Sequence, residues 1–82
     1  MKEIIIYSKP RCPYTNKLKE LLNKENIPFK SVDIWEAKPE DNIFKHEDGH
    51  IPTPQVRIGN KLIWDYKTEK DLVEEIKKLL KA

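Results

Sequence analysis

Apolar runs separated by charged and turn-forming residues predict an alternation of strands and helices along the chain. Consecutive apolar side chains in residues 3–7 indicate a strand that is buried on both faces, as in the centre of a sheet. Residues 13–25 carry leucines at helical spacing, so we expect a helix with one apolar face. A second strand is predicted over residues 29–34. Because a helix links these two strands, we expect them to run parallel.

The middle of the chain predicts a short second helix. Pro39 suits a first helical position, where its fixed φ is favourable and its missing N–H costs nothing. Ile43 and Phe44 would then face the core, and Gly49 would end the helix.

Two strands and a helix complete the predicted order. Residues 54–58 and 61–63 are expected to form strands, because Gly59-Asn60 between them is typical of a tight hairpin turn. A near capping box begins at Thr68, and the helix after it has one apolar face, formed by Leu72, Val73, Ile76, Leu79 and Leu80. The order βαβαββα predicts an α/β fold, with a mixed four-stranded sheet sandwiched by three helices.

The composition narrows the class of protein. Charged residues make up 37% of the chain but the net charge is only +2, so the signs are interspersed and we expect no nucleic-acid partner. No apolar run predicts a signal peptide or a membrane span. The length allows one domain, residues 1–82. A single cysteine excludes an internal disulfide, and a free thiol suits the reducing cytoplasm. We also expect a monomer.

That single cysteine, Cys12, falls where the first strand gives way to the first helix, at or beside the helix N-cap. Pro13 fits the first helical position. The free N–H groups of a first turn and the positive end of the helix dipole stabilise a negative charge there. Lys9 and Arg11 add positive charge, and the hydroxyl of Thr15 can donate to the sulfur. These features favour a reactive thiolate, whereas the alternative is an inert, buried cysteine.

Two segments carry a family resemblance. Residues 7–15, Tyr-Ser-Lys-Pro-Arg-Cys-Pro-Tyr-Thr, resemble the active-site loop of a glutaredoxin, with threonine in place of the second cysteine of Cys-Pro-Tyr-Cys. Residues 53–56, Thr-Pro-Gln-Val, resemble the family's Thr-Val-Pro-Gln-Val segment, whose proline is cis. The resemblance covers essentially the whole chain. It implies the glutaredoxin version of the thioredoxin-like fold.

The resemblance also implies roles for individual residues. Glutaredoxins bind glutathione beside the thiol, and the positions that match are Lys9, Tyr14, Thr53 and Pro54. After the fourth strand the family usually has Gly-Gly, where this chain has Trp64-Asp65. Asp65 is the candidate for holding the ammonium group of glutathione.

The resulting expectation is a glutathione-dependent thiol–disulfide oxidoreductase that acts by a monothiol mechanism through Cys12. One alternative is an iron–sulfur carrier, in which two chains and two glutathiones hold a [2Fe–2S] cluster. Another is a redox-sensing binding module without turnover. Residues 46–50 match His-Glu-x-x-His, but we expect no metal site there, because Gly49 would interrupt the helix that the zinc motif needs.

Overall fold

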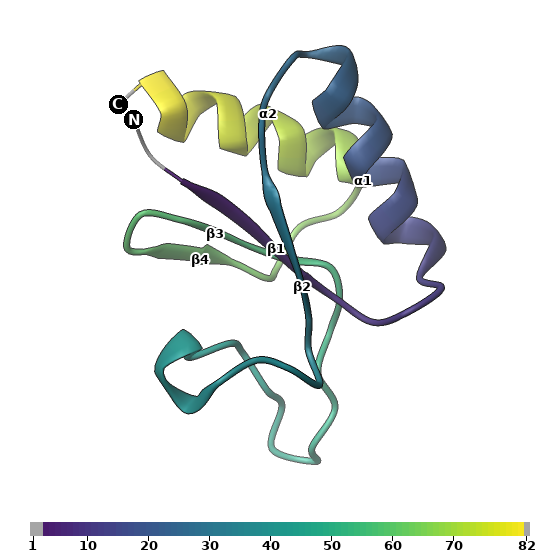
Figure 1. Cartoon of the computed structure of the whole chain (residues 1–82), viewed down its shortest axis with the longest axis vertical. Coiled ribbons are helices and arrows are strands. Elements are labelled where there is room, and N and C mark those ends of the chain that lie inside the picture. Colours follow the sequence, from purple (N-terminus) through teal and green to yellow (C-terminus); the bar gives the residue numbers. More distant parts are fainter. Residues whose placement is uncertain (1–2, 82) are drawn as a thin grey trace.

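The computed structural model describes residues 3–81, which form a four-stranded sheet and two helices (Figure 1). The elements in chain order are β1 (Ile4–Ser8), α1 (Pro13–Lys24), β2 (Lys30–Asp33), a 3₁₀ turn (Pro39–Asp41), β3 (Gln55–Ile58), β4 (Lys61–Ile63) and α2 (Glu69–Lys81). Within these residues, no helix combines the length and the apolar character needed to cross a membrane.

The sheet is mixed, with the strand order β2-β1-β3-β4. β1 pairs in parallel with β2 and antiparallel with β3, and β3 pairs antiparallel with β4. The predicted parallel pairing, the central position of the first strand and the hairpin are therefore confirmed. The register places Tyr7 opposite Gln55, so the C-terminal end of β1 lies beside the start of β3.

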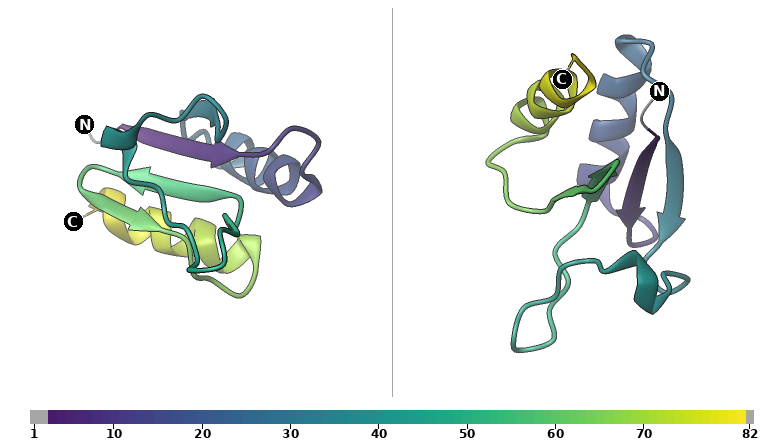
Figure 2. Two further views of the ribbon diagram at one scale, coloured as in Figure 1. Left: turned by 90° about the horizontal axis from the view of Figure 1, so that it is seen from below. Right: turned by 90° about the vertical axis from the view of Figure 1, so that its left-hand side faces the viewer.

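One face of the sheet is covered by both helices (Figure 2). Alternate strand residues point to this face, and they pack against the apolar faces of the helices in one core cluster. Its buried members are Ile4, Ile6, Leu18, Leu22, Val56, Ile58, Ile63, Leu72, Val73 and Ile76. The predicted inner face of the last helix is correct except at its end, where Leu80 is exposed.

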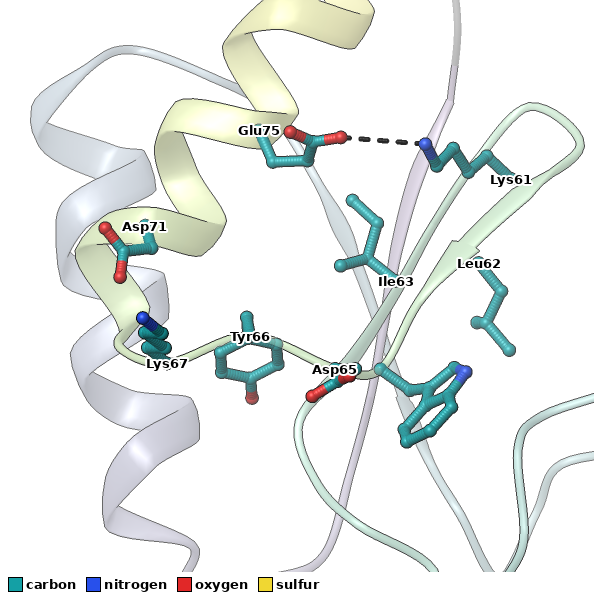
Figure 3. A pocket seen from close by; sticks show the side chains of 9 residues that line it. Lys61, Leu62, Ile63, Asp65, Tyr66, Lys67, Asp71 and Glu75 are labelled. Atoms are coloured by element: carbon teal, nitrogen blue, oxygen red, sulfur yellow. Dashed lines mark ion pairs between the residues drawn. The ribbon is translucent and has the colours of Figure 1, made fainter.

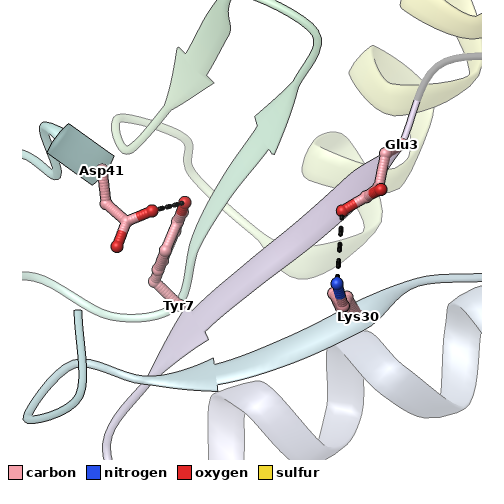
Figure 4. A network of polar contacts seen from close by, with 4 residues as sticks. All are labelled: Glu3, Tyr7, Lys30 and Asp41. Atoms are coloured by element: carbon pink, nitrogen blue, oxygen red, sulfur yellow. Dashed lines mark hydrogen bonds and ion pairs between the residues drawn. The ribbon is translucent and has the colours of Figure 1, made fainter. Parts of the chain in front are cut away.

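The other face of the sheet is held to the β2–β3 connection by polar contacts. The Tyr7 hydroxyl donates to Asp41 Oδ1 at 3.2 Å (Figure 4). Burial is the main cause that raises the pKa of Tyr7, so this phenol stays protonated and able to donate. Arg57 donates to the carbonyl oxygens of Asp41 and Asn42. An ion pair between Lys30 and Glu3, drawn in the same figure, is exposed and adds little stability.

The prediction of a second helix after Pro39 is wrong. Only one 3₁₀ turn forms, and Asn42 ends it in the left-handed conformation, with φ 49°. The backbone N–H and C=O of Phe44 bond to the side chain of Gln55 instead of to helical partners. The chain then makes an exposed turn, in which the His46 N–H donates to the His50 carbonyl at 2.8 Å. The sheet therefore carries two α-helices on one face, and is not sandwiched by three.

Candidate active site around Cys12

Cys12 is the N-cap residue of α1, as its place in the sequence predicts. Arg11 before it has a left-handed backbone, with φ 62°, and Pro13 after it takes the first helical position. This sharp turn leads the chain from β1 into α1. It leaves the Cys12 side chain half-buried, so the sulfur is close to the first turn of the helix and still reachable.

The loop before β3 forms the other wall of the site. Cys12 Sγ lies 3.8 Å from Thr53 Oγ1, although the two residues are 41 positions apart. The peptide bond between Thr53 and Pro54 is cis, which confirms the expectation from the resemblance. The pairing of β1 with β3 explains this proximity, because it places the end of one strand beside the start of the other.

The surroundings of the sulfur favour its ionised form. Partial burial, the largest single influence, raises the pKa of the Cys12 thiol. The hydroxyl and the backbone N–H of Thr15, the hydroxyl of Thr53 and the backbone N–H of Tyr14 act in the opposite direction and together outweigh burial. The net pKa is therefore below the ordinary value. The backbone contributions come from the free N–H groups at the start of α1.

Thr15 has a buried hydroxyl group close to the start of α1. Its side chain is 3% exposed, and within residues 3–81 its hydroxyl has no partner at ordinary hydrogen-bond geometry. A buried hydroxyl without a partner costs about 1–3 kcal/mol. This hydroxyl lowers the pKa of the Cys12 thiol, and a thiolate is a better hydrogen-bond acceptor than a thiol.

The other predicted site residues differ in where they lie relative to the Cys12 sulfur. Lys9 and Arg11 line a hollow together with Cys12. Tyr14 extends into solvent, with 60% of its surface exposed. Asp65 lines a separate cavity between β4 and α2, whose lining does not include Cys12 (Figure 3). The structure thus places Thr15 and Thr53 beside the sulfur and Lys9 and Arg11 in the lining of the same hollow, whereas Asp65 lines a different cavity.

Tyr66 belongs to the site, but sequence reasoning missed it. Its hydroxyl donates to the Pro54 carbonyl at 2.8 Å. The pKa of Tyr66 is raised mainly by burial, and further by the negative charges of Glu69 and Cys12. The phenol therefore stays protonated and remains a hydrogen-bond donor. The predicted hairpin could have pointed to this contact. Its strands pair Val56 with Ile63, and if the same pairing continues, the residues after β4 come to lie beside Pro54.

Trp64 holds the irregular connection against the sheet. Its ring stacks on that of Phe44, with the ring centroids 3.6 Å apart and the planes 7° from parallel. His46 approaches both rings edge-on. The Gln55 side chain, which is fully buried, binds both backbone groups of Phe44 and the carbonyl of Pro52. These contacts fix the segment that leads into the Thr53–Pro54 bond.

Comparison with known proteins agrees with the fold. The glutaredoxin family model matches residues 4–63. The chain is 30% identical over 59 residues to N-acetyl-S-hydroxy-L-cysteine reductase of Bacillus subtilis, covering 70% of this chain and 63% of that protein. It is 34% identical over 59 residues to glutaredoxin 1 of Rickettsia prowazekii, covering 70% and 62%. It therefore spans less than two thirds of the length of these two relatives.

A solved structure extends the similarity to nearly the whole chain. The solution structure of glutaredoxin from Brucella melitensis superposes with a TM-score of 0.63 and 28% identity, covering 95% of this chain and 82% of that one. Its match includes the region after residue 63, where the family model ends. The thioredoxin-like fold expected from the sequence is thereby confirmed, and the chain belongs to the glutaredoxin family.

Proposed function

We propose that this protein is a glutathione-dependent thiol–disulfide oxidoreductase that works through Cys12 by a monothiol mechanism. The observation that carries the proposal is the sulfur itself. It sits at the N-terminus of α1 with a lowered pKa and lies 3.8 Å from the Thr53 hydroxyl, beside the cis Pro54. A thiolate in such a setting is a nucleophile toward disulfides.

The reaction proceeds in two exchanges. The Cys12 thiolate attacks the glutathione sulfur of a mixed disulfide between a substrate and glutathione, and the substrate thiol leaves with the electron pair of the broken S–S bond. A second glutathione, as its thiolate, then attacks the glutathione bound to Cys12 and releases glutathione disulfide. The lowered pKa of Cys12 helps in the second exchange as well, because a more acidic thiol is a better leaving group.

The monothiol assignment rests on residue 15. The sequence contains one cysteine, and the position that the resemblance gives to a second cysteine holds Thr15. No thiol in the same chain can therefore resolve the adduct on Cys12, so an external thiol must do so. The Thr15 hydroxyl instead stabilises the thiolate that the second exchange regenerates.

Glutathione is proposed to lie along the Thr53–Pro54 loop. The loop carries its Thr53 hydroxyl within 3.8 Å of the sulfur, and Tyr66 holds the Pro54 carbonyl in place. Lys9, which lines the hollow at Cys12, is the proposed partner for a glutathione carboxylate, and the exposed ring of Tyr14 borders the thiol. Asp65 is proposed to hold the ammonium group at the far end of the ligand.

A glutathione-coupled assay with a substrate–glutathione mixed disulfide tests the function. We expect turnover by the unaltered protein and its loss in Cys12→Ser, which keeps the size of the side chain and removes the nucleophile. Mass spectrometry of the protein after one exchange should show a single glutathione on Cys12. Full activity of Cys12→Ser, or no adduct on the unaltered protein, would overturn the proposal.

A second substrate class comes from the Bacillus subtilis relative, which is named for reducing N-acetyl-S-hydroxy-L-cysteine. We propose small S-hydroxy compounds, which are sulfenic acids, as alternative substrates of Cys12. The Cys12 thiolate would attack the oxidised sulfur and displace hydroxide, which takes up a proton to leave as water, and a mixed disulfide forms on Cys12. Parallel assays with the S-hydroxy compound and with the glutathione mixed disulfide decide between the classes by their relative kcat/KM.

The predicted iron–sulfur and sensor roles are weaker alternatives. A [2Fe–2S] cluster is usually held by four ligands, and one chain offers one thiol. Within residues 3–81 there is no cluster of three or more potential metal ligands, so the side chains of a single chain do not fit the cluster. Two chains with two glutathiones remain the predicted arrangement for that role.

We also propose that the protein is a monomer located in the cytoplasm. A single reactive thiol suits a reducing compartment.

A further inference from the structure

The hollow that Lys9 and Arg11 line beside the sulfur reaches past Lys9, the proposed partner of a glutathione carboxylate, to Lys19 on α1 and Asp33 on β2. It has a volume of about 230 Å³ and is formed by the β1–α1 loop, the first turns of α1 and the end of β2. Cys12 and Thr15 line it, whereas the described residues of its lining include neither Thr53 nor Pro54. Thr15 is the buried residue whose hydroxyl lacks an ordinary partner.

Cationic side chains outnumber negative groups in the lining of this hollow, even when Cys12 is counted as a thiolate. Lys9, Arg11 and Lys19 contribute three cationic side chains, and Asp33 contributes one carboxylate. In the described part of the chain, none of the three cations forms an ion pair within 4.0 Å, and Asp33 already accepts a hydrogen bond from the Trp35 N–H at 2.9 Å. Because the whole chain carries a net charge of only +2, this concentration of unpaired positive charge is local.

Two exposed aromatic residues each lie two positions after a lining residue in the sequence. Trp35 follows Asp33 and is 75% exposed, and Tyr14 follows Cys12 and is 60% exposed. Among the described residues, only one other large hydrophobic side chain, Leu80, is exposed. Tryptophan, tyrosine and arginine are the residue types that most often dominate protein–protein contacts. Exposed aromatic residues this near in sequence to the cationic lining residues fit a polypeptide better than a small ion.

We propose that this hollow binds acidic side chains of a polypeptide substrate, next to the disulfide bond that Cys12 breaks. The proposal rests on the proposed function, since it names the class of substrate for the same thiol. Carboxylates of the substrate pair with Arg11 and Lys19, while the polypeptide chain packs against Trp35. The consequence is a preference for disulfides flanked by glutamate or aspartate, with the attraction screened by salt.

A single-exchange experiment tests this without any second reductant. Two peptides of equal length carry one cysteine as a disulfide with glutathione, flanked by glutamates in one and by lysines in the other. The Cys12 thiolate attacks the glutathione sulfur, the S–S bond breaks, and the peptide thiol leaves with the electron pair, while mass spectrometry follows the glutathione adduct that forms on Cys12. We expect the acidic peptide to react about tenfold faster at low salt, and this ratio to fall as salt is added.

Charge reversal on one helix provides the matched comparison. Lys19→Glu should reduce the ratio several-fold, whereas Lys17→Glu, an exposed position on α1 outside the hollow, should leave it nearly unchanged. Equal rates for the two peptides, or equal effects of the two variants, would overturn the inference. Reaction of the unaltered protein with an uncharged pyridyl disulfide, and its absence in Cys12→Ser, reports separately on the proposed function.

Discussion

The two faces of the sheet are held by different kinds of contact. On the helix-covered face, apolar side chains such as Ile6, Leu22 and Ile76 are fully buried against each other. On the loop-covered face, the fully buried side chains are Tyr7 and Gln55, and both make hydrogen bonds to the β2–β3 connection. The first face depends on apolar area removed from water, and the second combines the Trp64–Phe44 ring stack with polar groups that each need a specific partner.

This difference explains where the reactive sulfur is placed. Cys12 begins a helix of the apolar face, and Thr53 ends the connection that covers the polar face. The site therefore forms where the two kinds of packing meet. We expect variants on the apolar face to act mainly on global stability, and variants on the polar face to act on the geometry beside the sulfur.

The largest expected effect is on the apolar face. Leu22→Ala removes a fully buried side chain of α1 from the core and should lower the free energy of unfolding by about 3 kcal/mol. Urea denaturation measures this loss. Leu80→Ala is the control, because this α2 leucine is 36% exposed and should cost less than about 1 kcal/mol. Equal losses for the two variants would contradict the assignment of the core.

A smaller effect is expected from the polar face. Gln55→Leu keeps an apolar side chain of similar size but leaves both backbone groups of Phe44 without their partner, so we expect a loss of about 2 kcal/mol. Hydrogen exchange should accelerate most at the Phe44 amide and little in α1. Uniform acceleration across the sheet would show that this face is not a separate unit of stability.

Tyr66 tests the junction between the faces. Tyr66→Phe keeps the ring packed against the core and removes the donor to the Pro54 carbonyl, which should cost about 1 kcal/mol. Turnover should fall with it, because the carbonyl beside the thiol is then free to move. Tyr14→Phe, at an exposed ring, should leave the unfolding free energy unchanged. A Tyr66 variant with unaltered stability and turnover would remove Tyr66 from the site.

The smallest effect on stability, and the clearest on chemistry, is expected at Thr15. Thr15→Val removes a hydroxyl that lowers the Cys12 pKa, so the thiolate forms only at higher pH. The rate of alkylation by iodoacetamide should rise at a higher pH than in the unaltered protein. At neutral pH it should be about two- to tenfold lower, which corresponds to one hydrogen bond. Stability should change little, since valine replaces a buried hydroxyl without an ordinary partner.

Thr68→Val is the matched control for this profile. The Thr68 hydroxyl accepts a hydrogen bond from the Asp71 N–H at 3.1 Å at the start of α2. Its loss should cost about 1 kcal/mol of stability and leave the Cys12 profile in place. A profile that shifts in both variants, or in neither, would contradict the role of Thr15.

The apolar face was predictable because its signals are local. The leucine spacing of α1, the apolar run of β1 and the Gly59-Asn60 turn each lie within a few residues of the element they specify. The place of Cys12 at a helix N-cap followed from the same signals. The cis Thr53–Pro54 bond was expected from the resemblance, since the residues alone favour trans.

The polar face was not predictable in the same way, because its contacts join distant positions. Phe44 and Gln55 are 11 positions apart, and Tyr7 and Asp41 are 34 apart. The residues after Pro39 have a helix-like start, but the helix is lost because Gln55 binds the backbone groups that would continue it. Tyr66 was missed for the same reason, since its partner is a backbone carbonyl 12 positions away.

The exposed turn from His46 to His50 has a practical consequence. The turn closes on itself, through the His46 N–H to the His50 carbonyl and the Gly49 N–H to the His46 carbonyl. The connection is anchored before it by Phe44 and after it by Gln55. An epitope tag or a fluorescent reporter grafted between Glu47 and Asp48 would therefore project into solvent without disturbing the sulfur, and would give this small protein a handle for imaging and capture.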